Sequence, residues 1–259
     1  MALLPPLRIR LRLFAMQREA AGAKELRLEV PLGATVNDAW SAAVEAVPAL
    51  APGRASLRFA VNGTYADPDA PLADGDEVAC IPPVSGGDGT DDAAGRHRIL
   101  ELRAEPFPAG LAEELSSRLA TVEDGAVVTF LGQTRVTPGT PAPGQEAEAE
   151  RHAGARVEGL EYEAFEPMAL SVLATIAGEI EARWGVSRLA IVHRTGAVPP
   201  GEASILVVAA SPHRDAAFEA AHYAIDETKA RAPIWKAERF ADGRVWIGEP
   251  ARTSAPGDA

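Results

Sequence analysis

The sequence predicts an α+β protein built from two domains. Its 259 residues exceed the usual size of a single domain. Segments with an apolar residue at every second position are interspersed with segments of helical spacing. Residues 85–95, SGGDGTDDAAG, contain no large apolar side chain and separate the two groups. We therefore place domains at residues 1–87 and 98–250, with a linker at 88–97 and a disordered tail at 251–259.

The first domain begins with two strands and a helix. Residues 7–13 alternate aliphatic side chains with arginine, and residues 26–30 repeat the period of two after a short loop, which predicts a hairpin. Thr35 followed by Asp38 is typical of a capping box at the start of a helix. Pro48 ends that helix.

Two further strands complete the first domain. Residues 57–61 end at Asn62-Gly63, a tight-turn signal, and residues 78–84 form the last strand. The order of strand, strand, helix and further strands is that of a β-grasp. We predict this fold for residues 1–87.

The last strand of the first domain runs directly into Gly86-Gly87. Without side chains, a glycine backbone can enter a narrow site and bend freely. A terminal glycine carboxylate is also sterically open to adenylation and then to attack by a sulfur donor, which gives a thiocarboxylate. A bare Gly-Gly pair more commonly just begins a linker, and these two residues alone leave that alternative open.

The second domain alternates strands with helices. We expect its final helix to place Phe218, Ala221, Ile225 and Thr228 on one face, and residues 137–155, rich in Pro, Gly, Glu and Ala, to form a surface loop. The predicted strands lie at 99–102, 126–131, 157–163, 189–193, 203–210, 235–240 and 244–247, and the predicted helices at 109–120, 167–183 and 212–230.

A first candidate site is an anion site at the junction of strand and helix around Ser211-Pro212-His213-Arg214. Free backbone N–H groups and the positive end of the helix dipole favour a phosphate there, and His213 and Arg214 add charge. A capped surface helix with a solvated arginine is an equally good interpretation of these residues.

A second candidate is the cationic cluster of Lys229, Arg231 and Lys236 around Pro233. Such a cluster can bind a phosphorylated substrate, and a lysine beside other cations can have its pKa lowered enough to act as a base or nucleophile. Cations at a helix C-terminus are more often simply solvated. On these residues alone the solvated patch is the better interpretation.

A third candidate follows the strand that contains Phe130. The strand ends near Gly132, and Arg135 comes next, which places a guanidinium where it can make two hydrogen bonds to a phosphate. His193, at the end of another strand, is given no chemical role.

Composition excludes several classes of function. The net charge of −12 argues against a general nucleic-acid binder, and no apolar run is long enough for a membrane helix. Residues 1–14 mix arginine with apolar residues throughout, unlike a signal peptide. Cys80 is the only cysteine, so no intrachain disulfide can form, and we expect a cytoplasmic location.

These motifs together resemble one enzyme family. Residues 57–87, which contain VNGTYADPDAPLADGDEVACIPPVSGG, resemble the small sulfur-carrier subunit of molybdopterin synthase, a ubiquitin-like β-grasp. Residues 98–250 resemble the large subunit through DGAVVTFLGQTR, LEYEAFEPMA, IVHRTGAVPPGE, SPHRDAAFEAAHYAIDETKARAPIWKAE and GRVWI. The resemblance implies an α/β hammerhead-type fold for the second domain.

The resemblance also implies roles for individual residues. It makes Lys229 and Lys236 the essential catalytic lysines. The residues that it assigns to the substrate pocket are Arg135, His213, Arg214, Phe130 and Glu238. The chain departs from the family at Val136, where the family often has asparagine, and in the long Pro- and Ala-rich loop that follows.

The implied reaction transfers two sulfurs to cyclic pyranopterin monophosphate and needs neither a metal nor a redox cofactor. The implied partners are an activating enzyme that adenylates and sulfurates the carrier, and a second copy of the chain in a homodimer through the catalytic domain. Sulfur loading needs a free Gly87 carboxylate, but Gly87 is bonded to Asp88. We therefore expect a protease to cut after Gly87. The alternatives are an unprocessed, non-catalytic scaffold and a protein modifier.

Overall fold

The computed structural model describes residues 5–51, 57–81, 97–139 and 150–247, and side chains up to residue 243. The chain divides into two compact units, Met1–Pro83 and Val84–Ala259. Gly86, Gly87, residues 88–96 of the predicted linker and the predicted tail lie outside the described residues. The domain limits at residues 87 and 98 therefore stay predictions.

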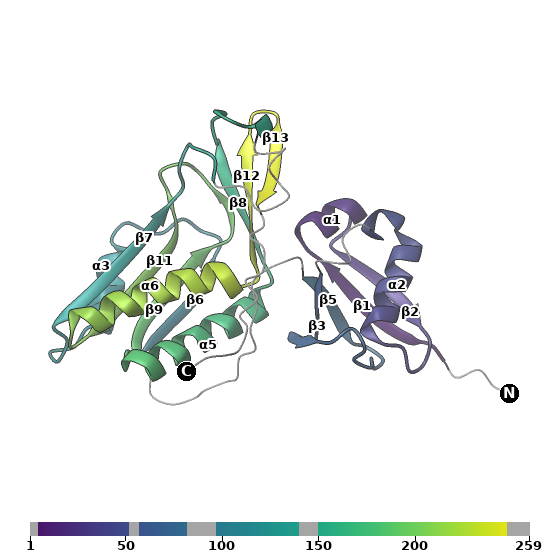
Figure 1. Ribbon diagram of the computed structural model, residues 1–259, viewed down its shortest axis with the longest axis horizontal. Helices are drawn as coiled ribbons and strands as arrows, with labels where there is room; N and C mark the ends of the chain where they lie inside the picture. Colours follow the sequence, from purple (N-terminus) through teal and green to yellow (C-terminus); the bar gives the residue numbers. More distant parts are fainter. Residues whose placement is uncertain (1–4, 52–56, 82–96, 140–149, 248–259) are drawn as a thin grey trace. The chain divides into compact units, whose positions relative to one another are not determined.

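The first unit is a five-stranded sheet with helices on one side (Figure 1). The strands run in the order β2-β1-β5-β3-β4, and β1 pairs parallel with β5 while its other neighbour, β2, is antiparallel. This is the predicted β-grasp. Its elements are β1 (Leu7–Leu13), α1 (Ala15–Ala21), β2 (Glu25–Val30), α2 (Val36–Ala46), β3 (Arg58–Val61), β4 (Thr64–Ala66) and β5 (Glu77–Ile81).

Local sequence signals explain the turns and caps of this unit. Thr35 Oγ1 accepts the Asp38 N–H, and Asp38 Oδ2 accepts the Thr35 N–H, so the predicted capping box is confirmed. Asn62 and Gly63 both have positive φ, 51° and 83°, as the tight turn between β3 and β4 requires. The predicted short loop before β2 is wrong, because helix α1 occupies most of it.

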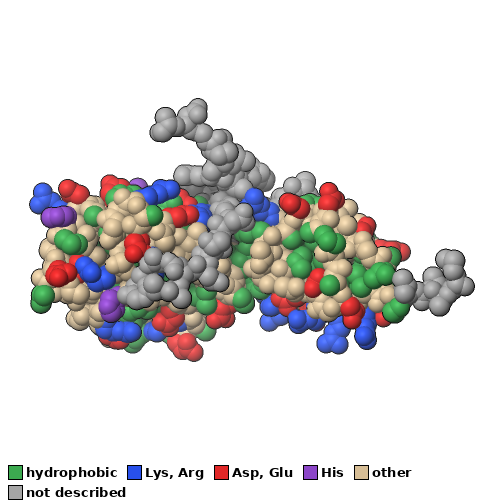
Figure 2. All heavy atoms as spheres, turned by 90° about the horizontal axis from the view of Figure 1, so that it is seen from below, with side chains coloured by type: hydrophobic (Ala, Val, Ile, Leu, Met, Phe, Trp, Pro, Cys, Tyr) green, Lys and Arg blue, Asp and Glu red, His purple; other side chains and the backbone are tan. Residues whose placement is uncertain are grey.

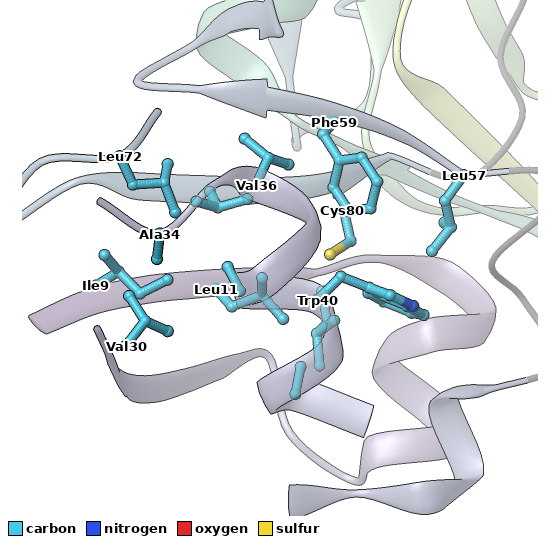
Figure 3. Close-up of a cluster of buried hydrophobic side chains, with 14 of the residues drawn as sticks. Ile9, Leu11, Val30, Ala34, Val36, Trp40, Leu57, Phe59, Leu72 and Cys80 are labelled. Carbon is cyan, nitrogen blue, oxygen red and sulfur yellow. The ribbon is translucent and has the colours of Figure 1, made fainter. Parts of the chain in front are cut away.

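The core of the first unit lies between the sheet and α2. Figure 3 shows Trp40 from the helix beside Phe59 and Cys80 from the strands, with Leu11 to the left of Trp40. The rings of Trp40 and Phe59 meet edge to face at 6.0 Å. The alternation that predicted β1 is the cause: its aliphatic residues are buried and its arginines face outward.

The outward face of β1 carries a ladder of ion pairs. Arg10 lies 3.2 Å from Glu77 and 3.8 Å from Glu25, and Arg12 lies 3.5 Å from Glu77. Figure 2 shows basic and acidic side chains intermingled along one border of this unit. These charges are partly exposed, so each pair contributes little to stability.

The second unit contains two four-stranded sheets, in the orders β6-β9-β11-β7 and β10-β8-β12-β13. Its strands are β6 (Arg98–Arg103), β7 (Ala126–Gln133), β8 (Gly159–Ala164), β9 (Arg188–Arg194), β10 (Gly196–Val198), β11 (Ala203–Ser211), β12 (Ile234–Phe240) and β13 (Gly243–Ile247). Its helices include α3 (Leu111–Leu119), α5 (Glu166–Trp184) and α6 (Arg214–Arg231). The short strand β10 was not predicted from the sequence.

Helices cover both faces of the first of these sheets. Helices α5 and α6 lie side by side on one face (Figure 1), where Ile176, Ile191 and Val207 share a core. Helix α3 packs on the other face against Val192 and Leu206. The prediction that Phe218 shares one face of α6 with Ala221 and Ile225 is wrong, because those two residues are buried and Phe218 is 62% exposed. Small alanines form most of the buried stripe of α6, which lets the helix lie close to the sheet.

Candidate functional site

The C-terminal end of α6 gathers most of the predicted site residues. Lys229 lies exposed in the last turn of the helix, and the chain then enters β12, where Lys236 is partly buried. Strand β7 runs antiparallel to β11, so its last residue, Gln133, lies beside the first residue of β11, Ala203, at one end of the strands. Since α6 runs back along β11, its C-terminus and the segment with Arg135 lie toward this same end of the strands.

Arg135 is exposed on a segment that is held on both sides. Before it, the Thr134 N–H donates to the Glu202 carbonyl at 2.9 Å, and the Gly201 N–H donates to the Thr134 carbonyl at 2.8 Å. After it, the Gly139 N–H donates to Glu238 Oε1 at 2.9 Å. The segment is therefore fixed although the guanidinium itself reaches solvent.

Lys236 and Glu238 lie on the same face of β12, two residues apart. A β-carbon placed on Gly139 would lie 2.9 Å from Glu238 Oε1 and 3.5 Å from Lys236 Nζ. Both charged groups therefore approach the same point on the Arg135 segment. Glu238 is only 4% exposed.

A largely buried polar layer of Tyr162, His193 and Ser204 lies next to these residues. Tyr162 pairs with Lys236 across the strands, and its hydroxyl is 3.2 Å from Ser204 Oγ. The edge of one ring meets the face of the other where Tyr162 contacts His193, at 4.9 Å. Burial raises the pKa of Tyr162, and the nearby charge of Glu238 raises it further.

His193 is neutral at pH 7. Burial, with a smaller contribution from the charge of Lys229, lowers the pKa of His193 to about 4. Its Nδ1 lies 2.7 Å from the Arg194 carbonyl, which can only accept, so Nδ1 carries the proton. The charge of Lys229 thus lies close enough to influence the uncharged imidazole of His193, whose orientation is fixed, at the C-terminal end of α6.

His213 and Arg214 lie at the opposite end of α6. His213 is the N-cap and Arg214 the first helical residue, and both are exposed. Arg214 lies 3.7 Å from Asp215, with 83% of its own side chain in solvent. At the usual rise of a helix, Arg214 and Lys229 are about 22 Å apart along the axis. The described fold therefore does not bring these two predicted residues into one pocket within a single chain.

Comparisons with known proteins address both units. The MoaE protein family matches residues 103–231, and the ThiS family matches residues 11–87. The molybdopterin synthase catalytic subunit of Bacillus subtilis (strain 168) is 41% identical over 143 residues, which are 55% of this chain and 82% of that protein. The human molybdopterin synthase catalytic subunit is 38% identical over 150 residues, 58% of this chain and 71% of that protein.

The chain belongs to the molybdopterin synthase catalytic subunit family. It carries a ThiS-family region before the MoaE region, so the predicted fusion of a small and a large subunit is confirmed. A solved molybdopterin synthase from Staphylococcus aureus is 35% identical, with a TM-score of 0.49, and covers 57% of this chain and 96% of that one. The family membership rests on the sequence matches.

One residue of the predicted cationic cluster is occupied elsewhere in this MoaE-type unit. Arg231 donates to Glu179 at 2.6 Å and to Glu227 at 3.2 Å, and Glu179 also accepts from the Tyr223 hydroxyl. These contacts tie α6 to α5. Arg231 is therefore structural, and Lys229 and Lys236 stay the predicted catalytic residues of the cluster.

Tyr162 and Gly139 lie beside predicted site residues, although neither was predicted from the sequence to belong to the site. Tyr162 lies in the motif LEYEAFEPMA, but its position opposite Lys236 depends on the pairing of β8 with β12. Gly139 lies in the Pro-rich run and carried no separate signal. Phe130, on β7, is 38% exposed on the sheet face that α6 covers.

Two negative findings concern only the described residues. No helix within those ranges combines the length and apolar character of a membrane span. Within them, no group of three or more His, Cys, Asp or Glu side chains has the arrangement of a metal site.

Proposed function

We propose that the chain is a fused molybdopterin synthase. Its N-terminal unit, cut after Gly87 and loaded with sulfur as a C-terminal thiocarboxylate, supplies sulfur to cyclic pyranopterin monophosphate in the second unit. Two such transfers build the dithiolene of molybdopterin. The observation that carries this proposal is that a ThiS-family region ending at residue 87 precedes a MoaE-family region in one chain.

The chemistry of the α6 C-terminal end supports this reaction. A cyclic phosphate is an anion, and Arg135 offers a planar guanidinium with several donors to hold it. Lys229 and Lys236 can stabilise negative charge as the thiocarboxylate sulfur attacks the pterin side chain. Phe130, on β7, would add an apolar wall to this site.

A second copy of the chain would complete the site. Strand β7 is an edge strand with exposed Val127, Phe130 and Leu131, and such an apolar edge needs a cover. If two β7 strands paired antiparallel about a two-fold axis, the Ala126 end of one would lie opposite the Gln133 end of the other. The Ala126 end pairs with Ser211, just before His213. The second copy would thereby bring His213 and Arg214 toward Arg135.

Cleavage after Gly87 is the first test. An amide at Gly87 cannot be adenylated as a carboxylate can, so we expect native cells to contain a fragment that ends at Gly87. Mass spectrometry of the chain from its own cells should find that fragment, part of it heavier by the replacement of one oxygen with sulfur. Only full-length chain, in cells whose molybdopterin synthesis is intact, would contradict the proposal.

The two alternatives predict other results. An unprocessed, non-catalytic scaffold would let Lys229→Ala complement a synthase-deficient strain fully. A protein modifier would place residues 1–87 on lysines of many cellular proteins, which mass spectrometry of the same extracts would reveal. We expect neither result.

A further inference from the structure

Glu238 differs from the other predicted pocket residues because it is nearly inaccessible. Arg135, His213 and Arg214 are exposed, whereas Glu238 is 4% exposed. A buried carboxylate needs donors to remain charged, and the Gly139 N–H is one of them, at 2.9 Å. Glu238 is therefore placed to bind other groups of the protein and not a substrate.

The hydrogen bond between the Gly139 N–H and Glu238 lies at the end of a short segment that has Arg135 near its start. The segment from residue 134 to 139 is held first by backbone hydrogen bonds of Thr134 with Gly201 and Glu202. The Val157 N–H then donates to the Val136 carbonyl at 2.9 Å. The third tie uses a side chain, that of Glu238, which lies 99 residues away in sequence.

Glycine at residue 139 is favoured by the space available and not by the backbone conformation. Its φ lies outside the left-handed region, so alanine could adopt this backbone. A β-carbon there would however approach Glu238 Oε1 to 2.9 Å, closer than real β-carbons come to any atom. Lys236 Nζ, at 3.5 Å from the same point, shows that the tie is made directly beside a predicted catalytic lysine.

We propose that Glu238 is a positioning residue, which holds the Arg135 segment against β12 through the Gly139 N–H and does not contact the substrate. This inference rests on the proposed function, because it assigns Arg135 to substrate binding. It follows that the hydrogen bond matters and that the negative charge as such does not. Loss of the tie should weaken substrate binding more than it slows the chemical step.

Three substitutions separate these effects. Gly139→Ala displaces the carboxylate and keeps all charges, so we expect KM for cyclic pyranopterin monophosphate to rise about tenfold, with kcat changed by less than about threefold. Glu238→Ala removes the acceptor and should do the same. Glu238→Gln keeps an acceptor oxygen and should restore both constants to within about threefold of the unsubstituted chain. The cleaved, sulfur-loaded protein is used throughout.

Gly178→Ala is the matched control, because a β-carbon at this glycine of α5 meets no atom within 4 Å. It should leave both constants unchanged. An unchanged KM in Gly139→Ala, or a loss of kcat of about a hundredfold in Glu238→Gln, would overturn the positioning role. The second result would make the charge of Glu238 part of the chemistry.

Hydrogen exchange gives a readout that needs no turnover. The peptide that contains residues 134–139 should exchange faster in Gly139→Ala and Glu238→Ala than in the unsubstituted chain, and at an unchanged rate in Glu238→Gln and Gly178→Ala. If this order holds but the unsubstituted chain makes no molybdopterin, the proposed function fails and the tie stands. If synthesis is normal and exchange is the same in all variants, the tie fails alone.

Discussion

The two ends of helix α6 are built differently. At the C-terminal end, Lys229 lies near a buried polar layer, and Arg231 ties the last turn to α5. At the N-terminal end, Arg214 and Phe218 project into solvent with 83% and 62% of their surface exposed. The difference indicates that one end is supported by contacts within the chain, whereas the other end presents groups outward, as a surface for a second copy would.

The largest effect should come from the lysines of the supported end. We expect Lys229→Ala and Lys236→Ala each to lower kcat by about a hundredfold to a thousandfold, because each removes a donor to charge that develops during sulfur transfer. Single-turnover assays with loaded carrier would measure this. Arg118→Ala removes a comparable, exposed cation from α3 and should change the rate little. Equal losses in all three variants would mean that the lysines act only through net charge.

The second prediction concerns the buried layer behind the lysines. The folded pKa of His193, about 4, lies below its ordinary value of 6.5, so the unfolded chain binds more protons between these values. Stability should therefore fall as pH drops from about 6.5 to about 4, by up to about 3 kcal/mol from this group. Urea unfolding of the unsubstituted chain and of His193→Asn, which cannot titrate, would measure the difference. Parallel pH curves would show that His193 is not the cause.

The sequence predicted the strands, the helix and the charged residues around the two ends of α6 better than it predicted how they are arranged in space. Local residue patterns predicted β7, β11, β12 and α6; β11, for example, is a continuous run of buried, mostly apolar residues. The sequence also indicated Lys229 and Arg214, but their separation depends on the length and direction of α6. The roles of Gly139 and Tyr162 follow from contacts across β12, between residues far apart in sequence, which no local pattern reveals.

A mixing experiment addresses the comparison directly. Lys229→Ala removes a predicted catalytic group from the C-terminal end of α6, and Arg214→Ala removes a predicted substrate-binding group from its N-terminal end. If a site takes Lys229 from one copy and Arg214 from another, a mixed dimer retains one complete site. Dissociating and reassociating equal amounts of the two inactive variants should then restore about a quarter of the unsubstituted activity, from random pairing. No recovery, with mixed dimers present by native mass spectrometry, would show that both residues act within one chain.

The smallest effect on stability is expected at the outward end itself. Phe218→Ser removes an exposed ring, so the free energy of unfolding at low protein concentration should change by no more than about 0.5 kcal/mol. Self-association should nevertheless weaken, because Phe218 and the β7 edge then offer less apolar area to a second copy. Sedimentation over a range of concentrations would detect this, with Val122→Ser, at a fully exposed side chain, as the control. If Phe218→Ser instead lowered stability and left association unchanged, its ring would be part of the fold, and the contrast between the two ends of α6 would be smaller than the exposed fractions indicate.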